Sequence, residues 1–239
     1  LASMVYYGQM DFIRTKDLGY NPCQIIRTAV NGNVDYKTVT GFIKNELTKD
    51  PAIQSVSFGS DGYVENVYVE NHQLKSQYKR IDDQYIGLME LKLRLGRNLS
   101  PVYGNDKIEG AIVNEAFVKA ADLQYPIGKR IRVNRNIDST VKVITGIVKD
   151  FHFGSLREPI LPMLMYMDEF PDGGIWVKFD QAKRREAMAA VAAVYKKALP
   201  NSVYQYSFLD ELNAKQYMQE QRWQQVITIA TVLSFIVCC

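Results

Sequence analysis

The residues of this sequence that could perform acid–base chemistry are a histidine close to an aspartate and a pair of adjacent aspartates. His152 follows Asp150 by two positions, and a histidine beside a carboxylate can act as a general base. No nucleophile or second partner lies near it in the sequence, so we interpret His152 as a turn residue held by hydrogen bonds. Asp82 and Asp83 could form a carboxylate pair, but acidic residues also favour helix N-termini, which is the role we predict for them.

Sequence motifs that bind nucleotides, metals or nucleic acids are absent. Gly128 and Lys129 lack the upstream glycine and the following Ser/Thr of a phosphate-binding loop. The three cysteines, Cys23, Cys238 and Cys239, cannot form a disulfide framework and show no metal-ligand spacing with the two histidines. The net charge of +3, from 29 basic and 26 acidic residues, gives no basic surface for nucleic acid. We therefore predict no enzyme activity, no catalytic or metal-binding residues, no cofactor and no nucleic-acid partner.

Two stretches near opposite ends of the sequence share the order strand, helix, proline, strand. In each, a β-prone run precedes an amphipathic helix that a proline ends. The first unit comprises Gln24–Val30, Tyr36–Thr48 with an apolar face of Val39, Phe42, Ile43 and Leu47, Pro51 and Ile53–Phe58. The second comprises Ile175–Phe179, Asp180 as an N-cap, Gln181–Leu199, Pro200 and Val203–Phe208. Two units of matching size predict an α+β fold with a split βαβ lobe, ferredoxin-like or porter-like, built from both chain ends.

Between these two units we expect a smaller, β-rich lobe inserted into the first lobe. The predicted strand Tyr63–Val69 crosses out of the first lobe. The predicted strands of the inserted lobe are Ala111–Val113, Leu161–Met167, and a hairpin of Arg130–Val133 and Val141–Val148 around the polar loop Asn134–Thr140. Its predicted helices are Asp82–Met89 and Glu115–Ala121, the second with Asn114 as N-cap, and Gly96–Asn98 is a turn.

Both ends of the sequence are apolar and uncharged. Leu1–Gln9 contains no charged residue, and none occurs from Trp223 to Cys239, where Val226–Cys239 reads VITIATVLSFIVCC. We predict that both ends are parts of transmembrane helices that flank an extracytoplasmic domain. The alternative interpretation of the C-terminal run is a buried core helix.

The C-terminal apolar run is predicted to continue a helix that begins in the soluble domain. Ser207 and Asp210 have the spacing of a capping box. No Gly or Pro interrupts the chain from Phe208 to Cys239. One helix would then leave the domain and enter the membrane, which makes it a mechanical connection.

Several short motifs resemble those of bacterial MacB/FtsX-type ABC transporter permeases, and they occur in the family order. Gln9–Asn21 resembles the segment that follows the first membrane helix in these permeases. The other motifs are Tyr85–Leu93 followed by Gly96 and Arg97, Val113–Phe117 with Asn114, Glu115 and Phe117, Pro126–Ile131 with Gly128 and Lys129, and Ile147–Phe153 with Asp150, Phe151 and His152. Together they cover nearly the whole chain, and the last is similar to that of Bacteroidetes-type members.

The resemblance implies a MacB-like periplasmic core domain, held between two membrane helices of a permease in the bacterial inner membrane and facing the periplasm. In this family the domain couples cytoplasmic ATP hydrolysis to export or to mechanical signalling. The implied partners are an ATP-binding subunit, a second permease copy, and a periplasmic adaptor or outer-membrane protein. The ten motif residues are implied to be structural or partner contacts, because the family has no catalytic residues in this domain.

The resemblance also implies a division of the chain into segments. Residues 1–19 would be the end of a membrane helix and a connector, 20–75 and 169–207 the two parts of the porter-like lobe, 76–168 the inserted lobe, and 208–239 the helix leading into a truncated membrane segment. The alternative function, from a different class, is an extracytoplasmic ligand-sensing domain of a membrane-bound signalling protein, which would also lie between two membrane helices.

Overall fold

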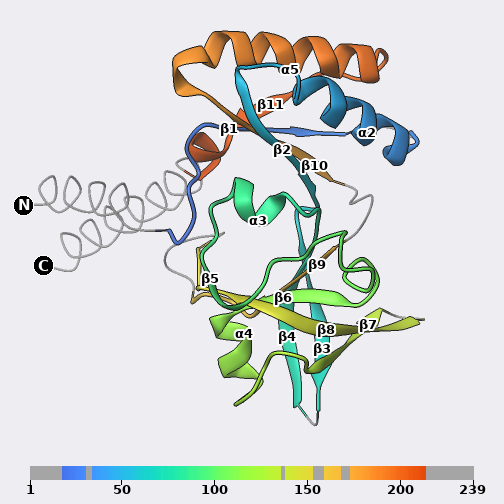
Figure 1. The fold of residues 1–239 in the computed structure, drawn as a ribbon, viewed down its shortest axis with the longest axis vertical. Coiled ribbons are helices and arrows are strands. Elements are labelled where there is room, and N and C mark those ends of the chain that lie inside the picture. Colours follow the sequence, from blue (N-terminus) through green and yellow to red (C-terminus); the bar gives the residue numbers. More distant parts are fainter. Residues whose placement is uncertain are drawn as a thin grey trace, which may run out of the picture.

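A computed structural model describes residues 18–30, 34–70, 72–135, 138–152, 159–167 and 173–213 of the chain (Figure 1). Both predicted membrane segments, and most of the long helix predicted from Phe208, lie outside these residues. Residues 209–213 are helical, so the described part of that helix begins within one residue of its predicted start. Among the described residues, no helix combines the length and apolar character needed to span a bilayer.

The described residues form a mixed α/β structure, which confirms the predicted α+β class. The strands are β1 (Ile25–Ala29), β2 (Ile53–Gly59), β3 (Tyr63–Val69), β4 (His72–Ile81), β5 (Leu93–Gly96), β6 (Gly110–Asn114), β7 (Arg130–Arg135), β8 (Asp138–Val148), β9 (Met163–Met167), β10 (Gly174–Phe179) and β11 (Tyr206–Phe208). The helices are α2 (Tyr36–Leu47), α3 (Tyr85–Leu88), α4 (Glu115–Ala120) and α5 (Arg184–Ala198), the last preceded by the 3-10 turn η1 (Gln181–Lys183). The described strands belong to one hydrogen-bonded sheet.

Strands from the two ends of the chain form one end of this sheet, which we call the four-stranded part. Its order is β11-β1-β10-β2, and every neighbouring pair is antiparallel. Helices α2 and α5 lie beside each other on one face of these strands (Figure 1). Ile43 and Leu47 of α2 and Val191 and Tyr195 of α5 pack with the strands in one apolar core. Each helix is therefore amphipathic and buries its apolar face, as the sequence predicts.

Helix α2 begins where it is predicted, and three of the four residues predicted on its apolar face, Val39, Ile43 and Leu47, pack in the core. Asp35 is its N-cap and accepts a hydrogen bond from an amide of the first turn. Thr40, Ile43 and Leu47 are buried, whereas Phe42, predicted on the apolar face, keeps 39% of its surface exposed. Thr40 can be buried because its hydroxyl donates to a backbone carbonyl one turn earlier.

The rest of the sheet closes on itself into six strands, which we call the strand ring. Its order is β4-β3-β7-β8-β6-β9, and β9 returns to pair in parallel with β4. Closure gives every strand of the ring a neighbour on both sides, so none offers a fully open edge. Strand β5 lies outside the ring and pairs with β8. Buried side chains such as Val67, Val133 and Leu164 form one core cluster with Phe117 of α4.

The four-stranded part meets the strand ring along a narrow contact that we call the joint. Pairing between β2 and β4 is limited to Gly59 and Ile81. The Ser60 amide also donates to the Arg80 carbonyl oxygen (2.9 Å). A separate apolar cluster lies beside the joint and has members from β1, β10, α3 and β9. Side-chain packing therefore holds the two parts together more than sheet pairing does.

The structure corrects the sequence prediction where strand pairing prevails over composition. The polar loop predicted at Asn134–Thr140 is wrong, because β7 and β8 stay paired as far as Arg135 and Asp138 and the ladder satisfies their backbone groups. Strands β4 and β5 are missing from the prediction, since β4 carries charges on both faces and all four residues of β5 are exposed, so neither shows a buried apolar face. The predicted boundary between residues 75 and 76 falls inside β4. The last predicted strand is shorter and begins at Tyr206.

The exposed face of α2 allows a test of its helical conformation. Gly41 lies inside α2, with open space where a Cβ would be placed. Alanine avoids the entropic penalty of glycine in a helix, so we expect Gly41→Ala to raise the free energy of unfolding by about 0.5–1 kcal/mol. Urea denaturation followed by circular dichroism measures the change. Gly62→Ala, at a φ of +84°, is the control that should lose stability; a loss for Gly41→Ala as well would contradict the helical assignment.

Candidate functional site

Asn114 fixes the beginning of α4, which confirms its predicted role as N-cap. Its Oδ1 accepts hydrogen bonds from the amides of Phe117 (3.0 Å) and Met163 (2.8 Å), and its Nδ2 donates to the Leu161 carbonyl (3.0 Å). Asn114 is only 1% exposed, so these bonds satisfy groups that water does not reach. One amide side chain therefore joins α4 to β9, while Phe117 is fully buried.

Glu115 and Asp150 hold the first turn of α4 against the end of β8. Asp150 Oδ1 accepts a hydrogen bond from the Ala116 amide (2.8 Å), and Glu115 Oε2 accepts one from the Asp150 amide (3.2 Å). Carboxylates at this position satisfy N–H groups that have no partner within the helix. The amide of His152 donates to the Leu18 carbonyl (2.8 Å). Asp150 therefore connects the end of β8 to α4, and the backbone of His152 connects the same loop to Leu18.

Gly96 is the last residue of β5, and Arg97 is the first residue of the loop that follows, where the sequence predicts a turn. Gly96 has a φ of +75°, and a Cβ there would lie 2.3 Å from the Thr145 carbonyl oxygen. Arg97 binds Asp106 with both terminal nitrogens (2.5 and 2.8 Å), and its guanidinium lies 3.8 Å from the centroid of the Tyr103 ring. Burial raises the pKa of Asp106, but the Arg97 hydrogen bond outweighs it with help from a backbone amide and holds that pKa below its ordinary value.

Asp106 and Tyr103 are functional neighbours of Arg97 that sequence reasoning misses. Asp106 is nine residues from Arg97, in a stretch without periodic apolar residues. A spacing of nine residues in such a stretch matches neither the helix nor the strand period. The contact between Arg97 and Asp106 therefore cannot be predicted from the sequence and is found only in the folded structure. The pair connects the beginning of the loop between β5 and β6 to a residue near its end.

Gly128 and Lys129 attach the loop after α4 to β8 and β3. Gly128 has a φ of +83°, and its amide donates to the Ile144 carbonyl (2.8 Å). The ammonium of Lys129 pairs with the carboxylate of Glu70, whose pKa it lowers mainly through their hydrogen bond. Both groups are substantially exposed, so this pair adds little stability.

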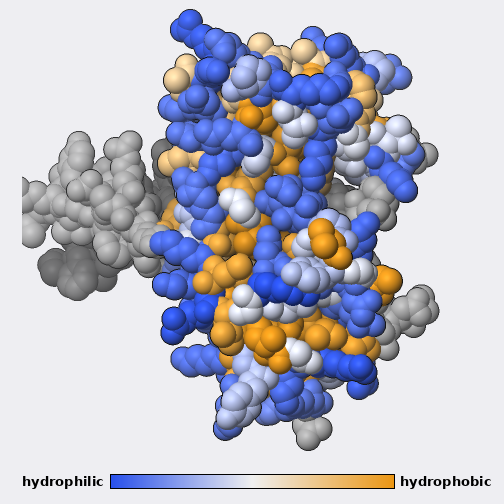
Figure 2. All heavy atoms as spheres, viewed as in Figure 1, coloured by the Kyte–Doolittle hydropathy of each residue, from blue (hydrophilic) through white to orange (hydrophobic). Residues whose placement is uncertain are grey.

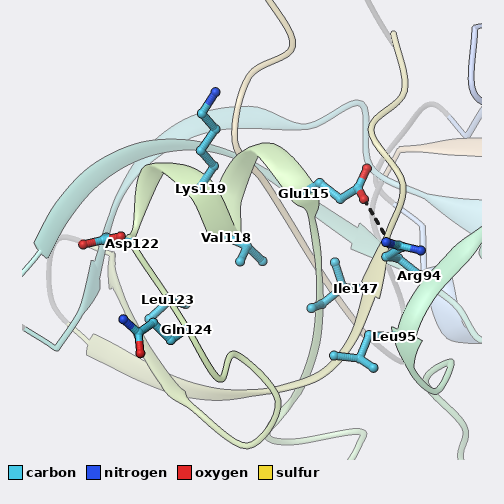
Figure 3. A pocket seen from close by; sticks show the side chains of 9 residues that line it. All are labelled: Arg94, Leu95, Glu115, Val118, Lys119, Asp122, Leu123, Gln124 and Ile147. Carbon is cyan, nitrogen blue, oxygen red and sulfur yellow. Dashed lines mark ion pairs between the residues drawn. The ribbon is translucent and has the colours of Figure 1, made fainter.

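A groove of ≈ 630 Å³ lies between α4 and β5 (Figure 3). Its lining is apolar at Leu95, Val118, Leu123 and Ile147 and polar at Arg94, Glu115, Lys119, Asp122 and Gln124. Arg94 Nε and Glu115 Oε1 form an ion pair of 3.6 Å at one end. An apolar lining with charges of both signs at the rim suits an amphipathic group. Glu115 is the motif residue that reaches this groove.

Exposed apolar side chains are concentrated in the same region of the chain. Figure 2 shows hydrophobic patches between polar residues in the half of the molecule that contains the strand ring. Among the described residues, eight of the thirteen exposed large apolar side chains lie from position 93 to 141: Leu93, Leu95, Val102, Tyr103, Ile108, Tyr125, Ile127 and Val141. No group of three or more His, Cys, Asp or Glu in the described part of the chain could hold a metal ion. Of these exposed apolar side chains, Leu95 lines the groove between α4 and β5.

The described residues nearest the two chain ends meet beside the joint, and we call Leu18–Asn21 together with Asn213 the chain-end clamp. Asn213 Nδ2 donates to Tyr20 Oη (2.8 Å). The Tyr20 ring packs edge-on against Phe151, with 6.2 Å between centroids. Gly19 has a φ of +80°, and a Cβ there would lie 2.6 Å from a backbone carbonyl oxygen of the loop that carries Phe151. The clamp therefore sits directly against the loop after β8.

Glu90 connects the chain-end clamp to the four-stranded part. Asn21 Nδ2 donates to Glu90 Oε2 (3.1 Å), and the other carboxylate oxygen pairs with the ammonium of Lys178 in β10. The hydrogen bond from Lys178 holds the pKa of Glu90 below its ordinary value. Sequence reasoning misses Glu90, Lys178 and Asn213, because no local pattern links residues so far apart. The clamp thus contacts both the strand ring and the four-stranded part.

The described residues form an α+β domain that consists of the strand ring and the four-stranded part. The described residues nearest the two chain ends lie together in the chain-end clamp. No protein-family model matches the sequence, and no curated protein does. The fold is similar to that of the periplasmic region of MacB from Actinobacillus actinomycetemcomitans, with a TM-score of 0.62 and 19% identity over 87% of this chain and 97% of that chain.

Two further solved structures have the same fold. The extracellular domain of the noncanonic ABC-type transporter YknZ from Gram-positive bacteria has a TM-score of 0.58 and 10% identity over 77% of this chain and 99% of that one. A domain assigned to a permease protein of Porphyromonas gingivalis has a TM-score of 0.56 and 12% identity over 78% and 89%. The chain has the fold of MacB-like periplasmic domains, as its motifs predict.

Removing the Asn114 side chain tests its structural role. Asn114→Ala deletes three hydrogen bonds and leaves buried backbone groups unpaired, so we expect the free energy of unfolding to fall by about 2–4 kcal/mol. Asn105→Ala, on an exposed loop, is the matched control and should change it by less than about 0.5 kcal/mol. Urea denaturation of both variants makes the comparison. Similar small losses in the two variants would contradict a role for Asn114 in joining α4 to β9.

Proposed function

We propose that this chain is the extracytoplasmic domain of an ABC transporter permease, held at the bacterial inner membrane and facing the periplasm. The observation that carries the proposal is the fold, which matches the periplasmic region of MacB over 87% of the chain. The resemblance of the sequence motifs supports it independently. The domain would couple ATP hydrolysis in the cytoplasm to export or to mechanical signalling and would catalyse no reaction itself.

The partners in this proposal follow from the same class of protein. An ATP-binding subunit would act on the domain through the membrane part of the permease, and two permease copies would form a dimer. The groove between α4 and β5, which the exposed Leu95 lines, is the surface that we propose for a periplasmic adaptor or an outer-membrane protein. Its charged rim and apolar lining resemble the composition of protein interfaces.

We also propose that the four-stranded part is a ferredoxin-like, porter-type lobe and that the strand ring is the lobe inserted into it. Along the chain its strands are β1, β2, β10 and β11, and in the sheet they follow the order fourth, first, third, second. Two helices on one face accompany this order, as in a split βαβ lobe. The inserted lobe would begin after β2 and end before β10.

Coupling would act through the chain-end clamp. Tyr20 and Asn213 bring the two ends of the domain together, Phe151 connects them to the strand ring, and Glu90 connects them to β10. A displacement of the flanking membrane helices would therefore reach both parts of the domain at one place. Packed elements with discrete arrangements can carry such coupling.

A distance measurement in the assembled permease tests this function without knowledge of the cargo. Spin labels at Val203→Cys, between α5 and β11, and at Val64→Cys in β3, two well-exposed positions, report the separation of the two parts in a cysteine-free background. With the ATP-binding subunit bound, a non-hydrolysable ATP analogue should shift the label separation. Gly19→Val places a side chain into backbone atoms and should reduce that shift severalfold, because the strain displaces the clamp.

The controls separate coupling from misfolding. Gly104→Val introduces a side chain into open space and should retain the full shift, while Asn213→Ala removes one clamp bond without strain and should reduce the shift partly. A nucleotide-dependent shift that persists in Gly19→Val would contradict coupling through the clamp. Failure of the permease to associate with any ATP-binding subunit would contradict the proposed function as a whole.

A further inference from the structure

A buried lysine lies beside the joint, facing both the strand ring and the four-stranded part. Lys79 is in β4 and is 2% exposed. Its Nζ lies 4.7 Å from the centroid of the Tyr85 ring and 5.0 Å from that of the Trp176 ring. Tyr85 belongs to α3 and Trp176 to β10, so the amine is held between two aromatic rings where the two parts of the domain meet. Burial of an ammonium group at such a place is unfavourable.

The charged groups that face Lys79 come from β1 and from the turn after β2. Arg27 and Asp61 form an ion pair there, and the Arg27 guanidinium also lies 5.3 Å from the centroid of the Trp176 ring. Burial lowers the pKa of Lys79 to about 7; the negative charge of Asp61 opposes this change and the positive charge of Arg27 adds to it. Tyr85 is fully buried, and burial keeps its pKa well above the ordinary value, so its phenol stays neutral.

The joint lies next to Lys79 and contains the shortest strand pairing in the sheet. Arg80 follows Lys79 directly, and its amide donates to Ser60 Oγ (2.9 Å), while its carbonyl oxygen accepts from the Ser60 amide (2.9 Å). On the other side of the paired residues Gly59 and Ile81, the Asp82 amide donates to the Phe58 carbonyl oxygen (3.1 Å). Opening of this short ladder would let water reach the side chain of Lys79 without disturbing the pairing inside the strand ring.

We propose that Lys79 makes the joint responsive to pH, so that taking up a proton there loosens the contact between the strand ring and the four-stranded part. The inference does not depend on the proposed function. In the closed joint the amine gains its proton only near neutral pH, whereas a solvated lysine holds it up to a pH near 10.5.

The direction of the effect follows from proton counting. Between about pH 10.5 and pH 7 the opened joint binds one proton more than the closed joint, so lowering the pH favours opening by up to about tenfold per pH unit. Below about pH 7 both states carry the proton, and the dependence levels off. The closed joint is therefore most stable at alkaline pH and loses that advantage as the pH falls towards neutrality.

Hydrogen exchange of the full chain tests the proposal. Protection factors, corrected for the intrinsic pH dependence of exchange, are measured by NMR for the joint amides of Ser60, Arg80 and Asp82 at pH 8.5 and 6.5. We expect protection of these amides to fall by about 25-fold at the lower pH, most of it between pH 8.5 and pH 7. Amides of Val67 and Val133, between β3 and β7, should change much less. An equal change at all these amides would overturn the proposal, since it would mean that the molecule opens as a whole.

Substitution separates Lys79 from other titrating groups. Lys79→Met keeps the length and the contact with the aromatic rings but has no proton to gain, so the pH dependence at the joint should disappear. Lys142→Met is the matched control, because Lys142 is also buried over an aromatic ring, that of Tyr166, but lies in β8. In the Lys142→Met variant, the joint amides should keep the pH dependence of the unsubstituted chain. Persistence of that dependence in Lys79→Met would overturn the proposal.

A direct titration covers the case in which Lys79→Met does not fold. The ¹³Cε and ¹⁵Nζ chemical shifts of Lys79 in the unsubstituted chain report its protonation. A midpoint near neutrality supports the proposal, and a midpoint near that of an exposed lysine would overturn it.

Discussion

The pairing of β1 is the constraint on which the rest of the structure depends. Both neighbours of β1 in the sheet, β10 and β11, come from the C-terminal part of the chain. Both partners of β1 therefore lie more than a hundred residues further along the sequence. Such non-local pairing is slow and entropically unfavourable to form, so the intervening chain must fold into something compact that ends close to where it began. The chain-end clamp, with Tyr20 bonded to Asn213, is a consequence of that return.

The strand ring meets this requirement and also explains why the joint is thin. In the ring, β9 pairs with one edge of β4 from Gln77 to Ile81, and β3 occupies the other edge as far as Tyr78. Only the last residues of β4 remain available to β2, and Ile81 is the one that pairs. The contact between the two parts then relies on side-chain packing, which is where a buried lysine and two aromatic rings meet. The strand pairing that closes the ring therefore also limits the pairing between β2 and β4 at the joint.

Local sequence patterns predict individual strands, helices and caps. They do not predict contacts between residues that are far apart in the sequence. The two strand–helix–proline–strand units and the cap at Asn114 follow from periodicity and residue type, and the structure has them. Burial of Lys79 could not be predicted, because a charged residue in an alternating strand is normally assigned to solvent. The Arg97–Asp106 pair and the parallel contact of β9 with β4 depend on closure of the ring, for which the chain has no local signal.

The motif residues show why a few short segments can identify a fold that overall identity of 10–19% leaves hidden. Core positions such as Val67 accept other apolar side chains of similar volume, so they drift without loss of the fold. Gly96 and Asn114 have no such freedom: a Cβ at Gly96 would overlap a carbonyl oxygen, and only an amide both donates and accepts as Asn114 does. These two residues are therefore tied to the architecture of the domain, because their roles depend on the backbone atoms around them.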